Sequence, residues 1–371
     1  MSQTPDRILV PSLRNLLACK LQLALELWQQ ARVQAAIASG LPPLPSVSPF
    51  PAQGPLLPEI PLNQVKDVAQ IWYVSAIALR LSPQVDCPPL PLSEQLAIAF
   101  EQALNSPSCP ALQTEQAAQR EHYNAILCHS ACWSETPGWW HWRLTDSGVA
   151  LWLQTVVDGR VIDGKGIDGR GIDGRIAEET IADETADETI VDRAVKEGDR
   201  PPQLHGNFTN RNKFLRNSTK NLFALQHAHA RCWSLLRLGE QEGLMAIAPL
   251  STGLTDPEHL DWAIERPSPL PWLDDTTLRC SDPAEQQLIT QLVVTCDCLA
   301  EFPALPPERI LKQAIALCRC FQAFDAQCRI VGAIAKTDPQ RAQVRLGLIG
   351  ATQKFLRALL MRLGAIAPLE L

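Results

Sequence analysis

The feature that most limits how this chain can fold is a repetitive acidic tract near its middle. The tract begins as VIDGK-GIDGR-GIDGR, with a period of five residues, and continues as IAEETIADETADETIVDR. Residues 158–200 hold 13 acidic and 7 basic residues, a local net charge of −6. A segment so rich in glycine and acid cannot bury enough apolar surface to fold alone. We therefore expect residues 158–204 to be a disordered linker between two folded parts.

Changes in composition divide the remainder of the chain. Leucine and alanine recur at helical spacing up to Gly40, so we expect an N-terminal helix within residues 1–40. Residues 41–62 contain eight prolines, too many for helix or sheet, and predict an extended connector. Residues 63–157 return to a globular composition, and residues 205–371 have helical periodicity almost throughout. The chain is thus predicted to be mainly α, with a C-terminal helical bundle and a smaller α+β module before it.

The expected elements of the first module are two amphipathic helices and an aromatic strand. AQIWYVSAIALRLS and LSEQLAIAFEQAL have helical spacing, and GWWHWRL (138–144) has the aromatic density of a strand. Thr145 is placed to cap the helix that follows. Alternation along the strand would bury one face and leave Trp140 on the other, where it could stack on a ligand or pack under the N-terminal helix.

The bundle is predicted to contain a helix at 220–238, capped by Asn217-Ser218-Thr219, and later helices at 283–300, 307–333 and 338–364. The last of these is expected to keep Arg345, Arg357 and Arg362 exposed around an apolar stripe.

The distribution of charge matters more than its sum. The formal net charge of −7 argues at first against a nucleic-acid partner, but much of the acid lies in the central tract. Residues 201–238 hold six Lys or Arg and no acid, and residues 299–371 hold ten bases and five acids. Because no apolar run approaches the ~20 residues of a membrane helix and the start lacks a secretory pattern, we expect a soluble, cytoplasmic protein.

Neither metal nor cofactor is predicted. The twelve cysteines are spread thinly, and pairs such as Cys296 and Cys298 are not the repeated C-x-x-C of a structural zinc site. His227 and His229 are two apart on a predicted helix and point about 200° from each other, so they cannot clasp one ion. The acids of the repeat are five apart, whereas a calcium loop needs them two apart.

One segment gives the chain a family likeness. FALQHAHARCWSLLR resembles the first helix of the DALR anticodon-binding domain of arginyl-tRNA synthetases, with Gln226 and the run Ala228-His229-Ala230-Arg231 matching directly. LPPERILKQAIALCRCFQAFDAQCRIVG (305–332) resembles a later helix of that domain through Phe321, Phe324, Cys328 and Arg329. Residues 345–371 resemble its closing helix, although Leu369-Glu370-Leu371 departs from the family's ending.

A weaker likeness covers residues 63–157, which resemble the additional domain at the start of the same enzymes. Trp139, Trp140 and Trp142 replace smaller hydrophobic residues and an Asn of the family's strand. The family's catalytic domain has no counterpart. Only 47 residues separate Val157 from His205, with no His-Ile-Gly-His-like or Lys-Met-Ser-Lys-Ser-like segment, whereas a nucleotide fold needs two multi-strand halves.

The resemblance therefore implies a non-catalytic tRNA-binding protein, with arginine-type tRNA as partner. The bundle would meet the anticodon arm, the additional-domain-like module the elbow, and the acidic tract would let the two act as a bivalent clamp. Two alternatives stay open: a module that docks on another protein such as a full-length synthetase, or half of a split ligase. A buried structural role for His229 and Phe321 competes with RNA contact, and Phe324 fits either. The RNA-contacting residues expected on this interpretation are Gln226, His229, Arg231, Phe324, Arg329, Arg345, Arg357, Lys213 and Lys220.

Overall fold

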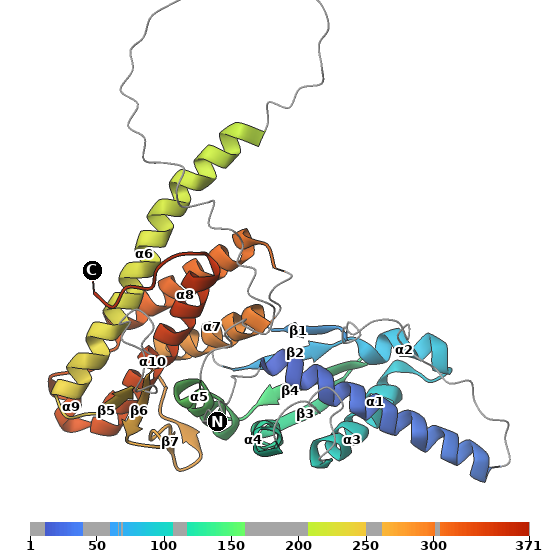
Figure 1. The fold of residues 1–371 in the computed structure, drawn as a ribbon. Helices are drawn as coiled ribbons and strands as arrows, with labels where there is room; N and C mark the ends of the chain where they lie inside the picture. The colour runs from blue at the N-terminus through green and yellow to red at the C-terminus, as the bar shows by residue number, and fades with distance from the viewer. Residues whose placement is uncertain are drawn as a thin grey trace, which may run out of the picture.

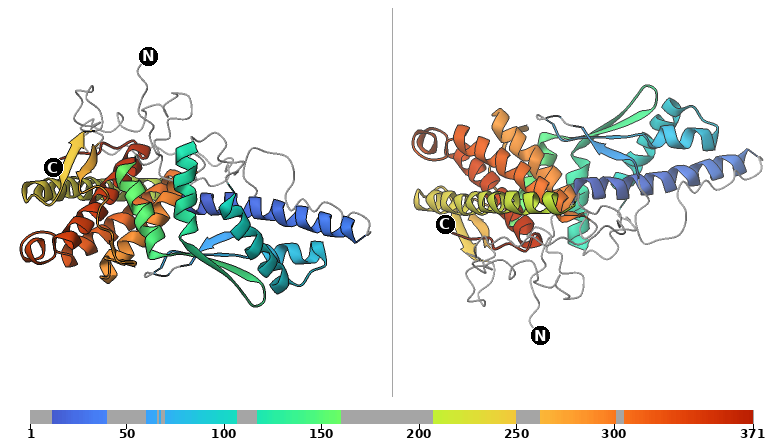
Figure 2. Two further views of the ribbon diagram at one scale, coloured as in Figure 1. Left: turned by 90° about the horizontal axis from the view of Figure 1, so that it is seen from below. Right: turned by 90° about the horizontal axis from the view of Figure 1, so that it is seen from above.

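The computed structural model describes residues 12–39, 60–65, 67, 70–106, 117–159, 207–249, 262–300 and 305–370, and of residues 117–120, 207–220 and 249 only the backbone. Most of the proline-rich connector and of the acidic tract lies outside the described residues. The described fold is mainly α, and its two halves lie side by side (Figures 1 and 2). No helix in this part of the chain is long and apolar enough to cross a membrane.

The N-terminal module is a small antiparallel sheet with helices packed on one face. Its strands follow the order β1-β2-β4-β3, and Tyr73 on β2 pairs with Trp142 on β4. The long helix α1 lies along α3 (Figure 1). The elements are α1 (Leu13–Ala38), β1 (Leu62–Gln64), β2 (Trp72–Ser75), α2 (Ile77–Val85), α3 (Pro89–Asn105), α4 (Ala117–Cys128), β3 (Ser130–Glu135), β4 (Trp139–Leu144) and α5 (Asp146–Asp158).

Two expectations for this module need correction. The segment 69–82 is not one helix, because its bulky β-prone residues form strand β2 before α2 begins at Ile77. On β4, Trp140 and Trp142 share the fully buried face, where Trp140 makes an edge contact with Phe100 at 4.9 Å between ring centroids. Trp140 is therefore core. The predicted cap of α5 is confirmed, since the Thr145 hydroxyl accepts a hydrogen bond from the Gly148 amide.

The C-terminal half is a bundle built around its last helix. α10 packs against α6, α7 and α8, and its residues from Ala342 to Leu360 are buried on nearly every side. Gly347 and Gly350 let two tryptophan rings approach α10, because a Cβ at Gly347 would lie 2.6 Å from Trp272 and one at Gly350 would lie 2.9 Å from Trp262. The elements are α6 (Asn207–Gln241), β5 (Ala246–Pro249), β6 (Trp262–Arg266), β7 (Leu273–Asp274), β8 (Thr277–Leu278), α7 (Pro283–Ala300), α8 (Pro307–Gln327), α9 (Ala333–Thr337) and α10 (Pro339–Arg362).

The helix predicted at 220–238 is longer than expected. α6 runs without a break through Asn217-Ser218-Thr219, so these residues are not a cap. Its first turns extend beyond the bundle (Figure 1). α8 ends at Gln327, six residues earlier than predicted, and Asp338 caps α10 by accepting a hydrogen bond from the Arg341 amide.

The two halves share one continuous apolar core and are also joined by polar contacts. Asp297 on α7 accepts hydrogen bonds from the Ser12 hydroxyl at 2.7 Å, the Tyr73 hydroxyl at 2.5 Å and the Arg14 amide at 3.2 Å. On α10, the buried Lys354 ammonium donates to the carbonyls of Val157 and Gly159 at the end of α5. These contacts fix both ends of the first module against the bundle.

Candidate nucleic-acid interface

The Ala-His-Ala-Arg motif lies where α6 enters the bundle. Leucine and alanine side chains of this helix face α10 and α8, while one stripe at helical spacing faces outward. The members of this exposed stripe are Phe223, His227, Arg231, Ser234 and Arg237.

His229 is on the opposite side and is fully buried. Its Nδ1 lies 2.7 Å from the Pro368 carbonyl oxygen, and its Nε2 lies 2.9 Å from Nε2 of Gln353. The Gln353 carbonyl oxygen accepts a hydrogen bond from the Trp262 indole at 3.1 Å. Burial lowers the pKa of His229 to about 4, so a neutral ring that donates from Nδ1 and accepts at Nε2 fits this chain of contacts. This placement corrects the expectation that His229 touches RNA.

The motif instead holds the end of the chain. Gln226 donates to the Ile366 carbonyl at 3.0 Å, His229 bonds Pro368, and Arg237 pairs with Glu370 at 2.5 Å. The last residues therefore run along α6 (Figure 1). Gln226 is half-buried and already engaged, so its predicted RNA contact is at best secondary to this structural one.

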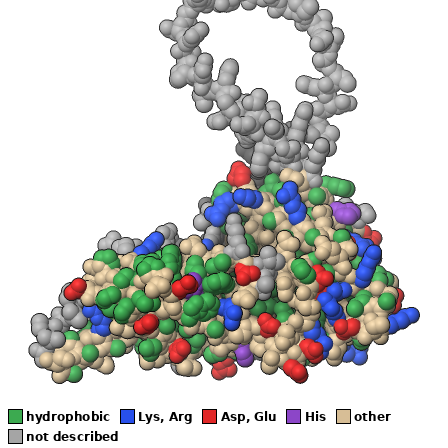
Figure 3. Space-filling view, turned by 180° about the vertical axis from the view of Figure 1, so that it is seen from behind, with side chains coloured by type: hydrophobic (Ala, Val, Ile, Leu, Met, Phe, Trp, Pro, Cys, Tyr) green, Lys and Arg blue, Asp and Glu red, His purple; other side chains and the backbone are tan. Residues whose placement is uncertain are grey.

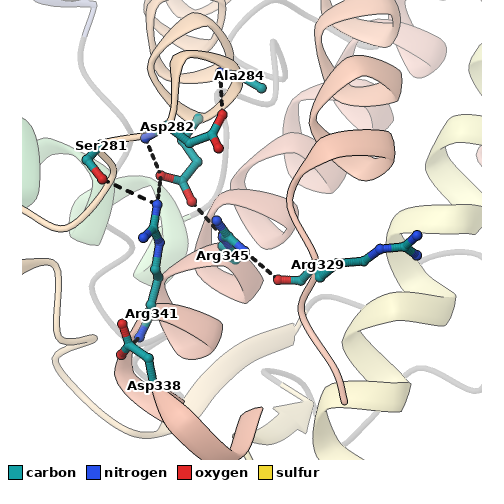
Figure 4. A network of polar contacts seen from close by, with 8 residues as sticks. Ser281, Asp282, Ala284, Arg329, Asp338, Arg341 and Arg345 are labelled. Carbon is teal, nitrogen blue, oxygen red and sulfur yellow. Dashed lines mark hydrogen bonds and ion pairs between the residues drawn. The ribbon is translucent and has the colours of Figure 1, made fainter. Parts of the chain in front are cut away.

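Phe324 and Arg345 are also interior residues, which corrects two further predicted contacts. Phe324, like Phe321, is in the apolar core. Arg345 forms a 2.6 Å ion pair with Glu285, which is 0% exposed, and donates to the Arg329 carbonyl at 2.6 Å. Figure 4 shows this network and the Arg329 side chain pointing away from it. Arg329 is exposed, so of the predicted contacts Phe324, Arg329 and Arg345 it is the one that reaches solvent.

The remaining predicted residues have mixed positions. Arg231 is exposed but forms a 3.0 Å ion pair with Asp325 on α8. Arg357 is half-buried on α10 and has partners of its own. Lys213 and Lys220 belong to α6, but their side chains lie outside the described residues.

The structure adds basic residues that the sequence interpretation did not select. Arg309, Lys312 and Arg319 are exposed on α8, and none of them forms an ion pair with another described residue. Their spacing of three and seven residues places them along one side of the helix, which a helical projection of 305–332 could have revealed. Figure 3 shows basic side chains over the upper and outer parts of the bundle.

A second candidate surface is the sheet face turned away from the helices. Trp133 and His141 stack with ring centroids 5.2 Å apart and an angle of 10°, and Trp72 lies within 5.6 Å of both. The Arg143 guanidinium lies 6.0 Å from the centre of the Trp133 ring. Figure 3 shows hydrophobic side chains gathered on this module. Alternation alone gave only a weak signal for this face, because β4 buries Trp140, His141 and Trp142 in succession and β3 has no fully buried residue.

The polar contacts of this aromatic cluster fix its rings. The Trp72 indole donates to Nδ1 of His141 at 3.2 Å, and Nε2 of His141 lies 3.1 Å from a Glu135 carboxylate oxygen, in an orientation that makes no hydrogen bond. Arg143 donates to Gln70 at 3.3 Å. Trp72, Trp133 and Arg143 are half-buried and His141 is buried, so the two tryptophan rings beside the guanidinium are the part of the cluster suited to stacking on an unpaired base.

The bundle is similar to a known family of domains. Residues 225–371 match the family described as the DALR anticodon binding domain. The match covers α6 from Leu225 onward and all the helices that follow it, about 40% of the chain. Among the described residues, no group of three or more His, Cys, Asp or Glu could hold a metal ion.

Two curated proteins resemble the chain. An arginine–tRNA ligase of Moorella thermoacetica is 32% identical over 148 residues, which cover 40% of this chain and 22% of that protein. An arginine–tRNA ligase of Pelodictyon phaeoclathratiforme is 31% identical over 149 residues, with the same two shares. The match thus spans about a fifth of the length of these relatives. No solved structure matches the chain.

Proposed function

We propose that this chain is a non-catalytic tRNA-binding protein of the cytoplasm that uses its DALR domain to grip the anticodon arm. The match of residues 225–371 to an anticodon-binding family carries the proposal. The exposed bases of α8 and Arg329 support it, because a phosphate backbone is bound chiefly by Lys and Arg that are free to meet it. Gln226, Arg231 and Arg357 remain candidates at the edges of this surface, together with Lys213 and Lys220 on the first turns of α6.

The N-terminal module would supply the second contact. Its sheet presents the half-buried rings of Trp72 and Trp133, with the buried His141 stacked on Trp133 and Arg143 beside that ring. Unpaired bases of a tRNA loop stack on such rings, and each stacked base adds about 1–3 kcal/mol. Because the two halves are packed together, the two contacts would bind the tRNA at fixed relative positions and not as two modules that move independently.

Catalysis is not proposed for this chain. Every strand pair in the described part is antiparallel, whereas a doubly wound nucleotide fold rests on parallel strands. The sequence also lacks the two signature segments of the resembling enzymes. We expect no transfer of arginine to tRNA when the protein is incubated with ATP, arginine and tRNA.

The test is binding of total tRNA in a gel shift, followed by sequencing of the retained species. We expect a shift at micromolar protein, with arginine-type tRNA enriched, since the two curated relatives are named arginine–tRNA ligases. The affinity should fall steeply with salt, because each neutralised phosphate adds about 0.7–0.9 to the slope of log K against log salt. No shift, or a shift that ignores salt, would contradict the proposal.

One observation favours a second candidate, a module that docks on another protein. Two of the outward bases of α6, Arg231 and Arg237, are already paired with Asp325 and Glu370. An arginine that already forms an ion pair binds a phosphate group less strongly than a free one. Co-purification from extract with and without ribonuclease separates the candidates: partners lost after ribonuclease treatment indicate RNA, and partners retained indicate protein docking.

A further inference from the structure

A cleft lies at the junction of the two halves, and its rim includes Arg309 and Lys312 of the basic α8 surface. Its volume is about 380 Å³, within the range of small-ligand sites. The bundle contributes residues from α7 and α8, and the N-terminal module contributes the start of α1 and strands β1 and β2. Its polar lining includes Arg14, Asn63, Gln64, Asp297, Arg309 and Lys312.

The floor of the cleft is polar and already satisfied. Asp297 accepts hydrogen bonds from Ser12, Tyr73 and the Arg14 amide, so its carboxylate is engaged on several sides. Burial raises the pKa of Asp297, and its contacts with Tyr73 and Ser12 oppose that rise. Because these donors come from the first module and Asp297 comes from the second, the floor forms only when the two halves are docked.

The rim is basic. Arg309 and Lys312 are one turn apart near the start of α8, both exposed, and neither pairs with an acid among the residues that the structure describes. Arg14 adds a third cation from the opposite side. Three bases face one engaged carboxylate, so the cleft as a whole favours an anion.

The wall supplied by β1 adds hydrogen-bond capacity. The Nε2 group of Gln64 is buried and donates to no atom of the described structure, and an unpaired buried donor costs stability until it finds an acceptor. Asn63, the preceding residue, is exposed at the rim. Amide donors beside Arg and Lys match the oxygens of a phosphate group.

We propose that this cleft is a phosphate-binding site for the RNA backbone, assembled from both halves of the chain. This inference rests on the proposed function and deepens it: a phosphodiester seated on Arg309, Lys312 and Arg14 would fix how the tRNA passes from one module to the other. The same chemistry would accept a free nucleotide, which the experiment distinguishes.

The first test removes the rim charges. Arg309→Gln/Lys312→Gln should weaken tRNA binding by about tenfold and lower the salt slope by about 1 to 2. Its matched control is Arg266→Gln/Lys336→Gln, which removes two exposed bases on β6 and α9, at the end of the bundle away from the cleft (Figure 1). The control should change affinity less than threefold. Equal weakening by both pairs would overturn the proposal and leave only a general charge effect.

The second test acts from the other module. Asn63→Asp is nearly isosteric and places a negative charge on the cleft rim, so tRNA affinity should fall several-fold. Asn105→Asp makes the same change at an exposed position at the end of α3 and should have no effect. Unfolding curves of the cleft variants should overlay that of the parent, because the altered side chains are exposed; Asn105→Asp loses its hydrogen bond to the Glu101 carbonyl and is compared at a temperature where it is fully folded. A normal affinity for Asn63→Asp would overturn the contribution of β1.

The two proposals fail in different ways. If tRNA binds and neither cleft variant matters, the cleft is excluded while the proposed function stands. If tRNA does not bind at all, AMP and inorganic phosphate are titrated by NMR. Saturable binding that is lost in Arg309→Gln/Lys312→Gln would then retain the cleft as a nucleotide site, and absence of binding would exclude both proposals.

Discussion

At the scale of single residues, the most informative side chain is His229, which is buried and neutral. In the unfolded chain its pKa is about 6.5, whereas burial lowers it to about 4 in the fold. Between these two pH values the unfolded state binds more protons, so stability falls as the pH decreases from 7 toward 4. The shift corresponds to at most about 3 kcal/mol.

We therefore expect the free energy of unfolding of His229→Asn, measured by denaturant titration, to depend less on pH between 7 and 4 than that of the parent. An Asn amide can replace Nδ1 as donor to Pro368, so the variant should still fold, with a loss of about 1–3 kcal/mol at pH 7 from the broken Gln353 contact. His227→Asn is the control, because His227 is exposed two residues away. Identical pH profiles for parent and His229→Asn would show that His229 is not held neutral.

At the scale of elements, what the sequence could predict depended on whether one face of an element meets water. α3 and α7 have such a face, and their bounds were predicted within a few residues. α10 is buried on nearly all sides, so its sequence has little amphipathic period and Arg345 was wrongly placed at the surface. Its partner Glu285 is 60 residues away, a pairing that no local pattern reveals.

The Glu285–Arg345 ion pair gives the second prediction. Glu285 also accepts a hydrogen bond from the Asp282 amide, and Asp282 accepts one from Ala284, a reciprocal cap at the start of α7 (Figure 4). Glu285→Ala should cost about 3–5 kcal/mol, because Arg345 would be left charged and buried without its partner. The double variant Glu285→Leu/Arg345→Met should be more stable than Glu285→Ala when both are unfolded by denaturant. The opposite order would mean that the core tolerates Arg345 without Glu285, through its remaining hydrogen bond to the Arg329 carbonyl.

The sheet of the N-terminal module gives the third prediction. Alternation predicted that β4 has two faces, but which face is covered depends on α3, and only the structure assigns His141 of β4 and Trp133 of β3 to the other face. Trp133→Leu should weaken tRNA binding by about 1–3 kcal/mol if a base stacks there. Arg143→Gln should weaken it less, and Arg80→Gln, an exposed change on α2, should not. Unchanged tRNA affinity in a folded Trp133→Leu variant would exclude the sheet from the interface.

At the scale of the whole molecule, the finding beyond reach of the sequence is that the two halves are docked. The acidic tract predicted two parts connected by a tether, and a tether says nothing about contact. No sequence motif marks the residues that make the contact. Asp297 binds Ser12 and Tyr73, and Lys354 on α10 binds the last carbonyls of α5. A positive side chain at the C-terminal end of a helix is favourable. Burial nevertheless lowers the pKa of Lys354 to about 7, because desolvation disfavours its charged form.

Docking through a shared core predicts that the chain unfolds as one unit. Calorimetry at neutral pH should give a single transition whose calorimetric and van't Hoff enthalpies agree.

Asp297→Ala leaves three donors without their acceptor and should cost about 2–4 kcal/mol. The double variant Asp297→Ala/Lys354→Met should separate the transition into two. Asp325→Ala, which removes only the half-buried partner of the exposed Arg231, should keep one transition and cost under about 1 kcal/mol. Two transitions in the parent protein would mean that the halves fold independently, and a cleft that needs both of them could not be a stable site.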